Sequence, residues 1–289
     1  MSGPRLDEFA RPGDAWSRAY LGSDFCQTLL PAPSTMLEAF AALRGRAAFA
    51  LVTPPVNDAG LHRVGVLLDL LAAETAPEAA TEVVVNDWGV LGLVRAHPSL
   101  TPVLGRLLTR MLRDPRLPPD RLEAEAPSTR ALQQSSVTSP PFQGLLRSFG
   151  VRRVELDPVV QGLAMDFDAM GLAPTLHAPF GYVTTGRVCL FAAMGQAEEH
   201  RFEVGAPCRQ ECRRFAARMT DAAPSPDAAL ITAGNTVMQR HERSVITRVL
   251  DALASREARV VVRDAPFGEV AWATEHLPSA TRWIEEHVS

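Results

Sequence analysis

The chain has 289 residues, of which 46% are hydrophobic and 21% are charged, a composition that fits one large globular domain or two small ones. Its formal net charge of -4 gives no electrostatic reason to expect nucleic acid or an acidic membrane as a partner. All 29 basic residues are arginine, which excludes chemistry that needs a lysine Schiff base or a lysine general base.

Nothing in the sequence predicts insertion into a membrane or secretion. No run of about eighteen apolar residues occurs, so we expect no membrane span. The first eight residues lack the apolar centre of a secretory signal. We therefore expect a cytoplasmic protein whose cysteines stay reduced, which favours metal binding over a disulfide framework.

Short apolar runs alternate with helical patterns along the chain. A helix is expected over 61–73, after the plausible cap residues Asn57 and Asp58. The expected strands are 19–21, 47–52, 82–85, 101–104, 151–156, 173–178, 229–232 and 259–263. Such strands, separated by helices, are typical of a parallel sheet that is covered on both faces. Their number favours an α/β fold with a TIM-barrel-like (β/α) barrel, and it leaves open whether that barrel is incomplete or distorted.

We expect a single barrel-like domain over 1–289 with two additions. The segment 113–141 is rich in turn residues and forms a long excursion, for which a functional role and plain surface decoration are equally open. The segment 186–214 carries three of the four cysteines.

The four cysteines are the main functional signal. Cys26 is remote, whereas Cys189, Cys208 and Cys212 fall in one short window. One remote thiol with three clustered thiols is typical of a four-thiolate metal site, which holds either a [4Fe–4S] cluster or a zinc ion. Cys26 and Cys189 each follow an apparent strand end, where barrel enzymes place their chemistry.

The pair formed by Cys208 and Cys212 has a three-residue spacer. If 210–219 is helical, both thiols lie on one face with β-carbons about 5–6 Å apart. The flanking arginines, Arg209, Arg213 and Arg214, are expected to lower the thiol pKa values.

Two alternatives remain at this point. Free cysteine is among the most buried residue types, so each thiol could simply belong to the core. Structural zinc sites usually have two-residue spacers within a cysteine pair, yet spacing alone does not separate zinc from an iron–sulfur cluster.

The motifs around these cysteines resemble a known family. The chain is similar to the collagenase-like U-type peptidase family and, within it, to the UbiV-like branch of ubiquinone-biosynthesis proteins. The resemblance covers about 15–265 and rests on Tyr20-Leu21-Gly22-Ser23-Asp24-Phe25-Cys26, Asn86-Asp87-Trp88-Gly89, Gly186-Arg187-Val188-Cys189 and Cys208-x-x-x-Cys212.

This resemblance implies a cofactor, a reaction and a partner. It implies that Cys26, Cys189, Cys208 and Cys212 bind a [4Fe–4S] cluster on a barrel-like α/β fold. It implies a part in oxygen-independent hydroxylation of an aromatic or quinone precursor, with prephenate as the oxygen donor. The implied partner is a homologous subunit in a heterodimer. A non-catalytic iron–sulfur subunit and a zinc-stabilised binding protein are the other functions that we considered.

Four further residues are candidates for substrate binding. Asn86 and Asp87 follow a strand, where a capped turn is the simpler interpretation. His177 lies on an apolar strand and is more often a hydrogen-bonded core histidine than a base. Arg187 can bind a carboxylate through its guanidinium fork. Besides these four, Asn235 occupies another possible strand end, where ordinary turn chemistry also suffices. No hydrolase motif is present, so peptidase activity is not expected.

Overall fold

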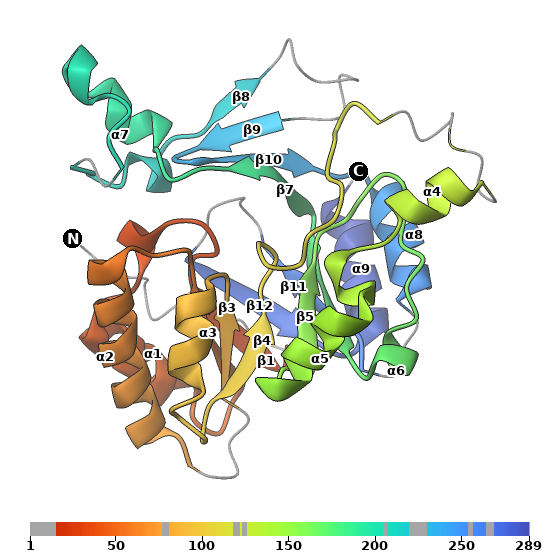
Figure 1. The fold of residues 1–289 in the computed structure, drawn as a ribbon, viewed down its shortest axis with the longest axis horizontal. Helices are drawn as coiled ribbons and strands as arrows, with labels where there is room; N and C mark the ends of the chain where they lie inside the picture. The colour runs from red at the N-terminus through yellow and green to blue at the C-terminus, as the bar shows by residue number, and fades with distance from the viewer. Residues whose placement is uncertain are drawn as a thin grey trace.

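The computed structural model describes residues 16–76, 81–117, 122, 126–204, 207–219, 230–253, 257–263 and 269–288. Within them, eight strands close into a barrel in the order β1-β12-β11-β6-β5-β4-β3-β2 (Figure 1). The strands are β1 (Arg18–Gly22), β2 (Ala48–Thr53), β3 (Glu82–Val85), β4 (Thr101–Leu104), β5 (Arg153–Leu156), β6 (Ala173–Ala178), β11 (Arg259–Val262) and β12 (Val270–Thr274). The predicted TIM-barrel-like α/β fold is confirmed.

One strand makes the barrel irregular. β12 runs antiparallel to both of its neighbours, β1 and β11, whereas the other neighbouring pairs are parallel. A regular (β/α) barrel has only parallel strands. The sequence prediction did not include β12, because its short Val-Ala-Trp-Ala-Thr run gives a weak strand signal.

Helices cover the outside of the barrel, with α1, α2 and α3 on one side in Figure 1 and α5, α6, α8 and α9 on the other. The helices are α1 (Pro33–Leu43), α2 (Asp58–Glu74), α3 (Trp88–Val94), α4 (Pro127–Leu132), α5 (Pro140–Ser148), α6 (Phe167–Met170), α7 (Leu190–Met194), α8 (Arg243–Ala252) and α9 (Leu277–His287). The predicted cap of α2 is confirmed, since the Asn57 side chain accepts a hydrogen bond from the backbone N–H of Gly60.

Successive side chains along each strand point alternately to the outside and the inside of the barrel, which gives two separate apolar clusters. In β1, Ala19 and Leu21 belong to the large core between the barrel and its helices, whereas Tyr20 belongs to the barrel interior. Small side chains fill most of that interior, as Ala50 of β2 and Ala271 of β12 illustrate. Buried charged side chains complete it. The barrel is therefore a packed core, and chemistry is left to its ends.

A second sheet lies over one end of the barrel (Figure 1). It is antiparallel, in the order β7-β10-β9-β8, with β7 (Phe180–Thr185), β10 (Thr236–Arg240), β9 (Leu230–Ala233) and β8 (Ala217–Met219). The chain enters it directly from β6 through the cis peptide before Pro179. A cluster that includes Phe25, Phe180 and Met238 packs the sheet on the barrel mouth.

This sheet corrects one prediction. The run 229–232 was expected as a strand of the parallel sheet, but it contributes β9 to the antiparallel sheet, and Ala229 lies outside the described residues. An apolar run predicts a strand without naming its partners, because pairing depends on the turn that follows. Here that turn is a two-residue hairpin at Gly234 and Asn235.

The expected excursion over 113–141 joins β4 to β5. Positions 118–121 and 123–125 of it lie outside the described residues. Its described part contains α4, the 3-10 helix η4 (Ser136–Thr138) and the start of α5. It also carries Arg113 to the barrel mouth, where the side chain pairs with Asp157. Separately, no helix within the described ranges is both long and apolar enough to cross a membrane.

Candidate functional site

The four cysteines meet at the end of the barrel that the second sheet covers. Cys26, Cys189, Cys208 and Cys212 line one small cavity, together with Gly234 and Asn235 of the β9–β10 hairpin. All four are partly buried free thiols. The fold therefore brings the remote cysteine to the clustered three, as the four-thiolate hypothesis requires.

Different elements carry the four thiols. Cys26 follows β1 and precedes the 3-10 helix η2 (Gln27–Leu29), and the Ser23 hydroxyl accepts hydrogen bonds from the backbone N–H groups of Phe25 and Cys26. Cys189 is the N-cap of α7, where its Sγ accepts from the N–H of Ala192 at 3.5 Å. Local hydrogen bonds thus hold the backbone at Cys26 and the thiol of Cys189.

The helix expected over 210–219 is not formed. Cys212 lies in the short 3-10 helix η6 (Glu211–Arg213), and the chain then enters β8. Gln210 adopts a left-handed backbone with φ of 59°, which breaks any helix between the two cysteines. Its N–H donates to Cys208 Sγ at 3.2 Å. The loop, rather than a helix face, sets the spacing of this pair.

The expectation that arginines lower the thiol pKa values is also wrong for this pair. Burial raises the pKa of Cys212 to about 12, and repulsion from the neighbouring thiols adds to the shift. Burial likewise raises the pKa of Cys208. Arg213 instead pairs with Glu269, and Arg209 and Arg214 are exposed. The apolar surroundings therefore favour the neutral thiols in the metal-free protein.

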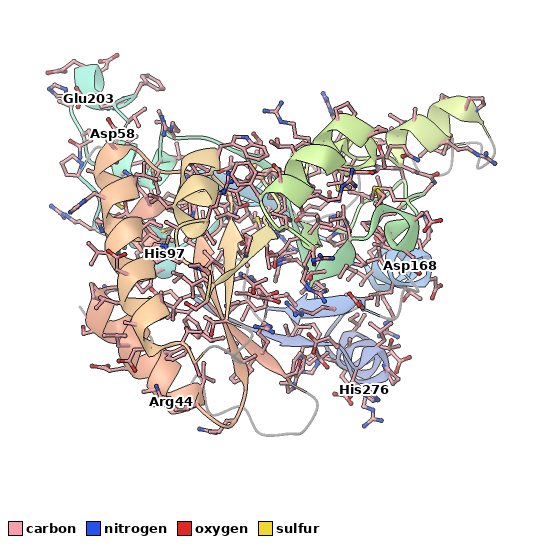
Figure 2. All side chains as sticks on the ribbon, turned by 60° about the horizontal axis from the view of Figure 1, so that its bottom comes forward. Arg44, Asp58, His97, Asp168, Glu203 and His276 are labelled. Carbon is pink, nitrogen blue, oxygen red and sulfur yellow. The ribbon has the colours of Figure 1, made fainter. Side chains whose placement is uncertain are left out.

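A larger cavity of about 180 Å³ adjoins the four-cysteine cavity and shares Cys26, Cys189 and Cys208 with it. Arg187 lines this larger cavity, and its guanidinium donates to the carbonyl oxygen of Val56 at 2.8 Å. Two residues that are remote from each other in sequence, Glu203 and Asn57, also line it, and Asn57 directly precedes α2. Figure 2 shows Glu203 at the same end of the molecule as Asp58, the first residue of α2.

The structure does not bring the other substrate-binding candidates to these cavities. Asp87 caps α3 by accepting from the N–H groups of Gly89 and Val90. Asn86 is buried in the barrel mouth and bonds Asp24 and the carbonyl oxygen of Thr53. The structural interpretation therefore accounts for both residues.

His177 lies inside the barrel rather than at the cavities. Its Nε2 is 2.6 Å from Oε2 of Glu155, and both side chains are buried. Its other ring nitrogen has no hydrogen-bond partner among the described residues. Arg187 is thus the one of the four candidates that lines the cavities described above.

Sequence reasoning missed a buried ion network that supports the site. Arg106 lies between two carboxylates, 2.7 Å from Oδ2 of Asp24 and 2.8 Å from Oδ1 of Asp157. Its guanidinium also stacks 5.0 Å from the ring centroid of Phe25, the residue before Cys26. Burial alone would raise the pKa of Asp157, but Arg106 and Arg113 hold it below its usual value. The positions just after β4 and β5 were the available signal, because chemistry in barrels gathers at strand ends.

Within the described ranges, no three imidazole, carboxylate or thiolate groups are gathered so that they could hold a metal ion. The four thiols share the lining of one cavity without forming a ready-made ligand set for a single ion. The residue types nevertheless fit a cluster, because four thiolates are the usual ligands of [4Fe–4S].

No family model, curated protein or solved structure matches the chain. Fold and site together define an α/β-barrel protein with four free cysteines around one cavity at the barrel's covered end.

Proposed function

We propose that this protein is an iron–sulfur protein in which Cys26, Cys189, Cys208 and Cys212 hold a [4Fe–4S] cluster. The observation that carries the proposal is that three segments, one of them remote in sequence, place the four thiols around one cavity. Each Zn–S bond is about 2.3 Å long, so a single zinc ion draws four sulfur atoms close together. In a cluster each thiolate binds a different iron atom, and the cluster is the cofactor that the family resemblance supports.

Such a cluster would supply electron transfer, because four thiolates leave no iron open to a substrate. We therefore place the small-molecule substrate in the adjoining cavity. The exposed guanidinium of Arg187 is held at that cavity by its bond to Val56 and can bind a carboxylate there. Hydroxylation of an aromatic or quinone precursor without O₂, with prephenate as oxygen donor, is the reaction that the family resemblance supports.

The resemblance also supports a homologous subunit as partner. The segment around the cysteines exposes six large apolar side chains, which we call the apolar patch: Leu190, Met194, Phe202, Val204, Phe215 and Met219. β8, which contributes Met219 to this patch, ends its sheet among the described residues, and all three of its residues are exposed. Exposed patches and open edges of this kind mark interaction sites. The alternative function is that of a non-catalytic iron–sulfur subunit for such a partner.

Metal content tests the cofactor. Protein purified without O₂ should contain about four irons and four sulfides per chain and absorb in the visible range. Cys208→Ala should lose the cluster, whereas Arg214→Gln, an exposed change two residues after Cys212, should keep it. Zinc without sulfide would establish the zinc-stabilised binding protein instead, and full iron retention in Cys208→Ala would refute the ligand assignment.

Co-expression with a homologous subunit tests the partner. The two chains should co-purify, and Phe202→Glu within the apolar patch should separate them, whereas Leu145→Glu on α5 should not. Activity of each chain alone then decides between a hydroxylase component and a non-catalytic subunit. A monomer in light scattering, with no association with any homologue, would contradict the partner proposal.

A further inference from the structure

Two carboxamide side chains connect the cysteine-bearing segments. Asn235, at the tip of the β9–β10 hairpin, donates from Nδ2 to the carbonyl oxygens of Phe25 at 2.8 Å and Gly186 at 2.7 Å. Phe25 directly precedes Cys26, and Gly186 lies three residues before Cys189. One amide group therefore joins the loops that carry the first two thiols.

The same hairpin makes further bonds to the second loop. The backbone carbonyl of Asn235 accepts from the N–H of Gly186 at 3.0 Å and from the Thr185 hydroxyl at 3.3 Å. The carbonyl of Gly234 accepts from the N–H of Leu190, the residue after Cys189. Asn235 Oδ1 accepts from the Thr236 hydroxyl, which orients the amide with its NH₂ group toward the two loops. The hairpin thus presents Asn235 in a fixed orientation.

Gln210 makes the corresponding connection for the remaining pair. It lies between Cys208 and Cys212, and its Nε2 donates to the carbonyl oxygen of Thr28 at 2.7 Å. Thr28 lies two residues after Cys26. Glutamine in a left-handed conformation is uncommon and costs about 1 kcal/mol or more, so the surrounding contacts must stabilise it.

We infer that Asn235 and Gln210 are positioning residues whose carboxamides hold the three cysteine-bearing segments around one cavity. Each amide donates to backbone carbonyls of the segments that carry the cysteines. Asn235 joins the Cys26 loop to the Cys189 loop. Gln210 joins the Cys26 loop to the Cys208–Cys212 segment, so both connections meet at the Cys26 loop. The inference rests on the proposed function for the reason why the thiols are held together, whereas its test needs no metal.

The test measures thiol proximity in the metal-free protein. With Cys208→Ser and Cys212→Ser, only Cys26 and Cys189 remain as thiols. A short bis-maleimide should join them within one chain, and Asn235→Asp should slow that reaction about tenfold, because two hydrogen bonds become carboxylate–carbonyl contacts. Aspartate suits a turn as well as asparagine does, so a residue that only formed the turn would tolerate this change.

Gln210 is tested in the same way with Cys26 and Cys208 as the remaining thiols. Gln210→Gly removes the side-chain amide, but glycine readily adopts the left-handed backbone. The variant therefore tests the hydrogen bond to Thr28 without changing the conformation of the loop. We expect slower cross-linking in Gln210→Gly and unchanged cross-linking in Gln134→Ala, whose amide bonds Ala164 far from the site. Circular dichroism and melting temperature confirm that each variant is folded.

The two proposals fail separately. Cross-linking rates equal to the parent in both Asn235→Asp and Gln210→Gly would overturn the inference, whatever metal the protein holds. Slower cross-linking in a protein that never acquires iron would uphold the inference and refute the cluster. In iron-loaded protein, both variants should also release iron to a chelator about tenfold faster than the parent.

Discussion

Gly234 lies directly against Cys212. A β-carbon at position 234 would be 3.2 Å from Cβ of Cys212 and 3.8 Å from Sγ of Cys189, and Gly234 itself has φ of +61°. The left-handed backbone therefore favours glycine where the hairpin approaches the thiols, and a β-carbon there would also be crowded by Cys212.

Gly234→Ala should therefore disturb the site and the fold together. We expect a loss of about 1–2 kcal/mol in the free energy of unfolding from the left-handed conformation. We also expect lower iron content, because Cys212 must move. Gly195→Ala, where a β-carbon has nothing within 4 Å, is the matched control. Equal unfolding midpoints in urea for the two variants would contradict this account.

Arg106→Met should destabilise the protein strongly. The change leaves the Asp24 and Asp157 carboxylates buried without their shared partner, which costs about 3–5 kcal/mol. Arg116→Met removes an arginine of which 81% of the side chain is exposed and should have little effect. Urea unfolding measures both, and a small difference between them would argue against the network.

Asp157 should make stability depend on acid pH. Because its pKa is lowered in the folded state, the stability that its charge contributes is present above pH about 4 and is lost as pH falls further. Asp157→Asn should be clearly less stable than the parent at pH 7, and the difference should shrink in acid. Asp168→Asn, at an exposed aspartate on α6, is the control. A difference that does not change with pH would exclude this explanation.

His241 should contribute a second dependence at milder pH. Burial lowers its pKa to about 4, so the unfolded chain binds a proton more readily between pH 6.5 and 4. Stability is then complete above pH 6.5 and falls with decreasing pH, by up to about 3 kcal/mol. His241→Gln should flatten this part of the profile, and His62→Gln, an exposed histidine on α2, serves as the control. An unchanged slope in His241→Gln would refute the assignment.

Local patterns predicted much of the barrel. The strands β3, β4 and β6 have the predicted bounds, because strands that are covered on both faces form nearly continuous apolar runs. The start of α2 was also predicted, since Asn57 caps it through a contact only three residues away. The helix over 210–219 was wrong because Gln210 is held in a left-handed conformation by a bond to Thr28, which no local pattern contains.

The sequence by itself determined the residue types of the site: four cysteines, one remote and three clustered, on a chain of alternating strands and helices. Only the tertiary structure decided that Cys26 faces the other three, that β12 closes the barrel antiparallel, and that Arg106 joins Asp24 to Asp157. Periodicity records whether a residue faces the core. It does not record which distant loop a single amide or guanidinium will bond, because that choice depends on packing across the whole fold.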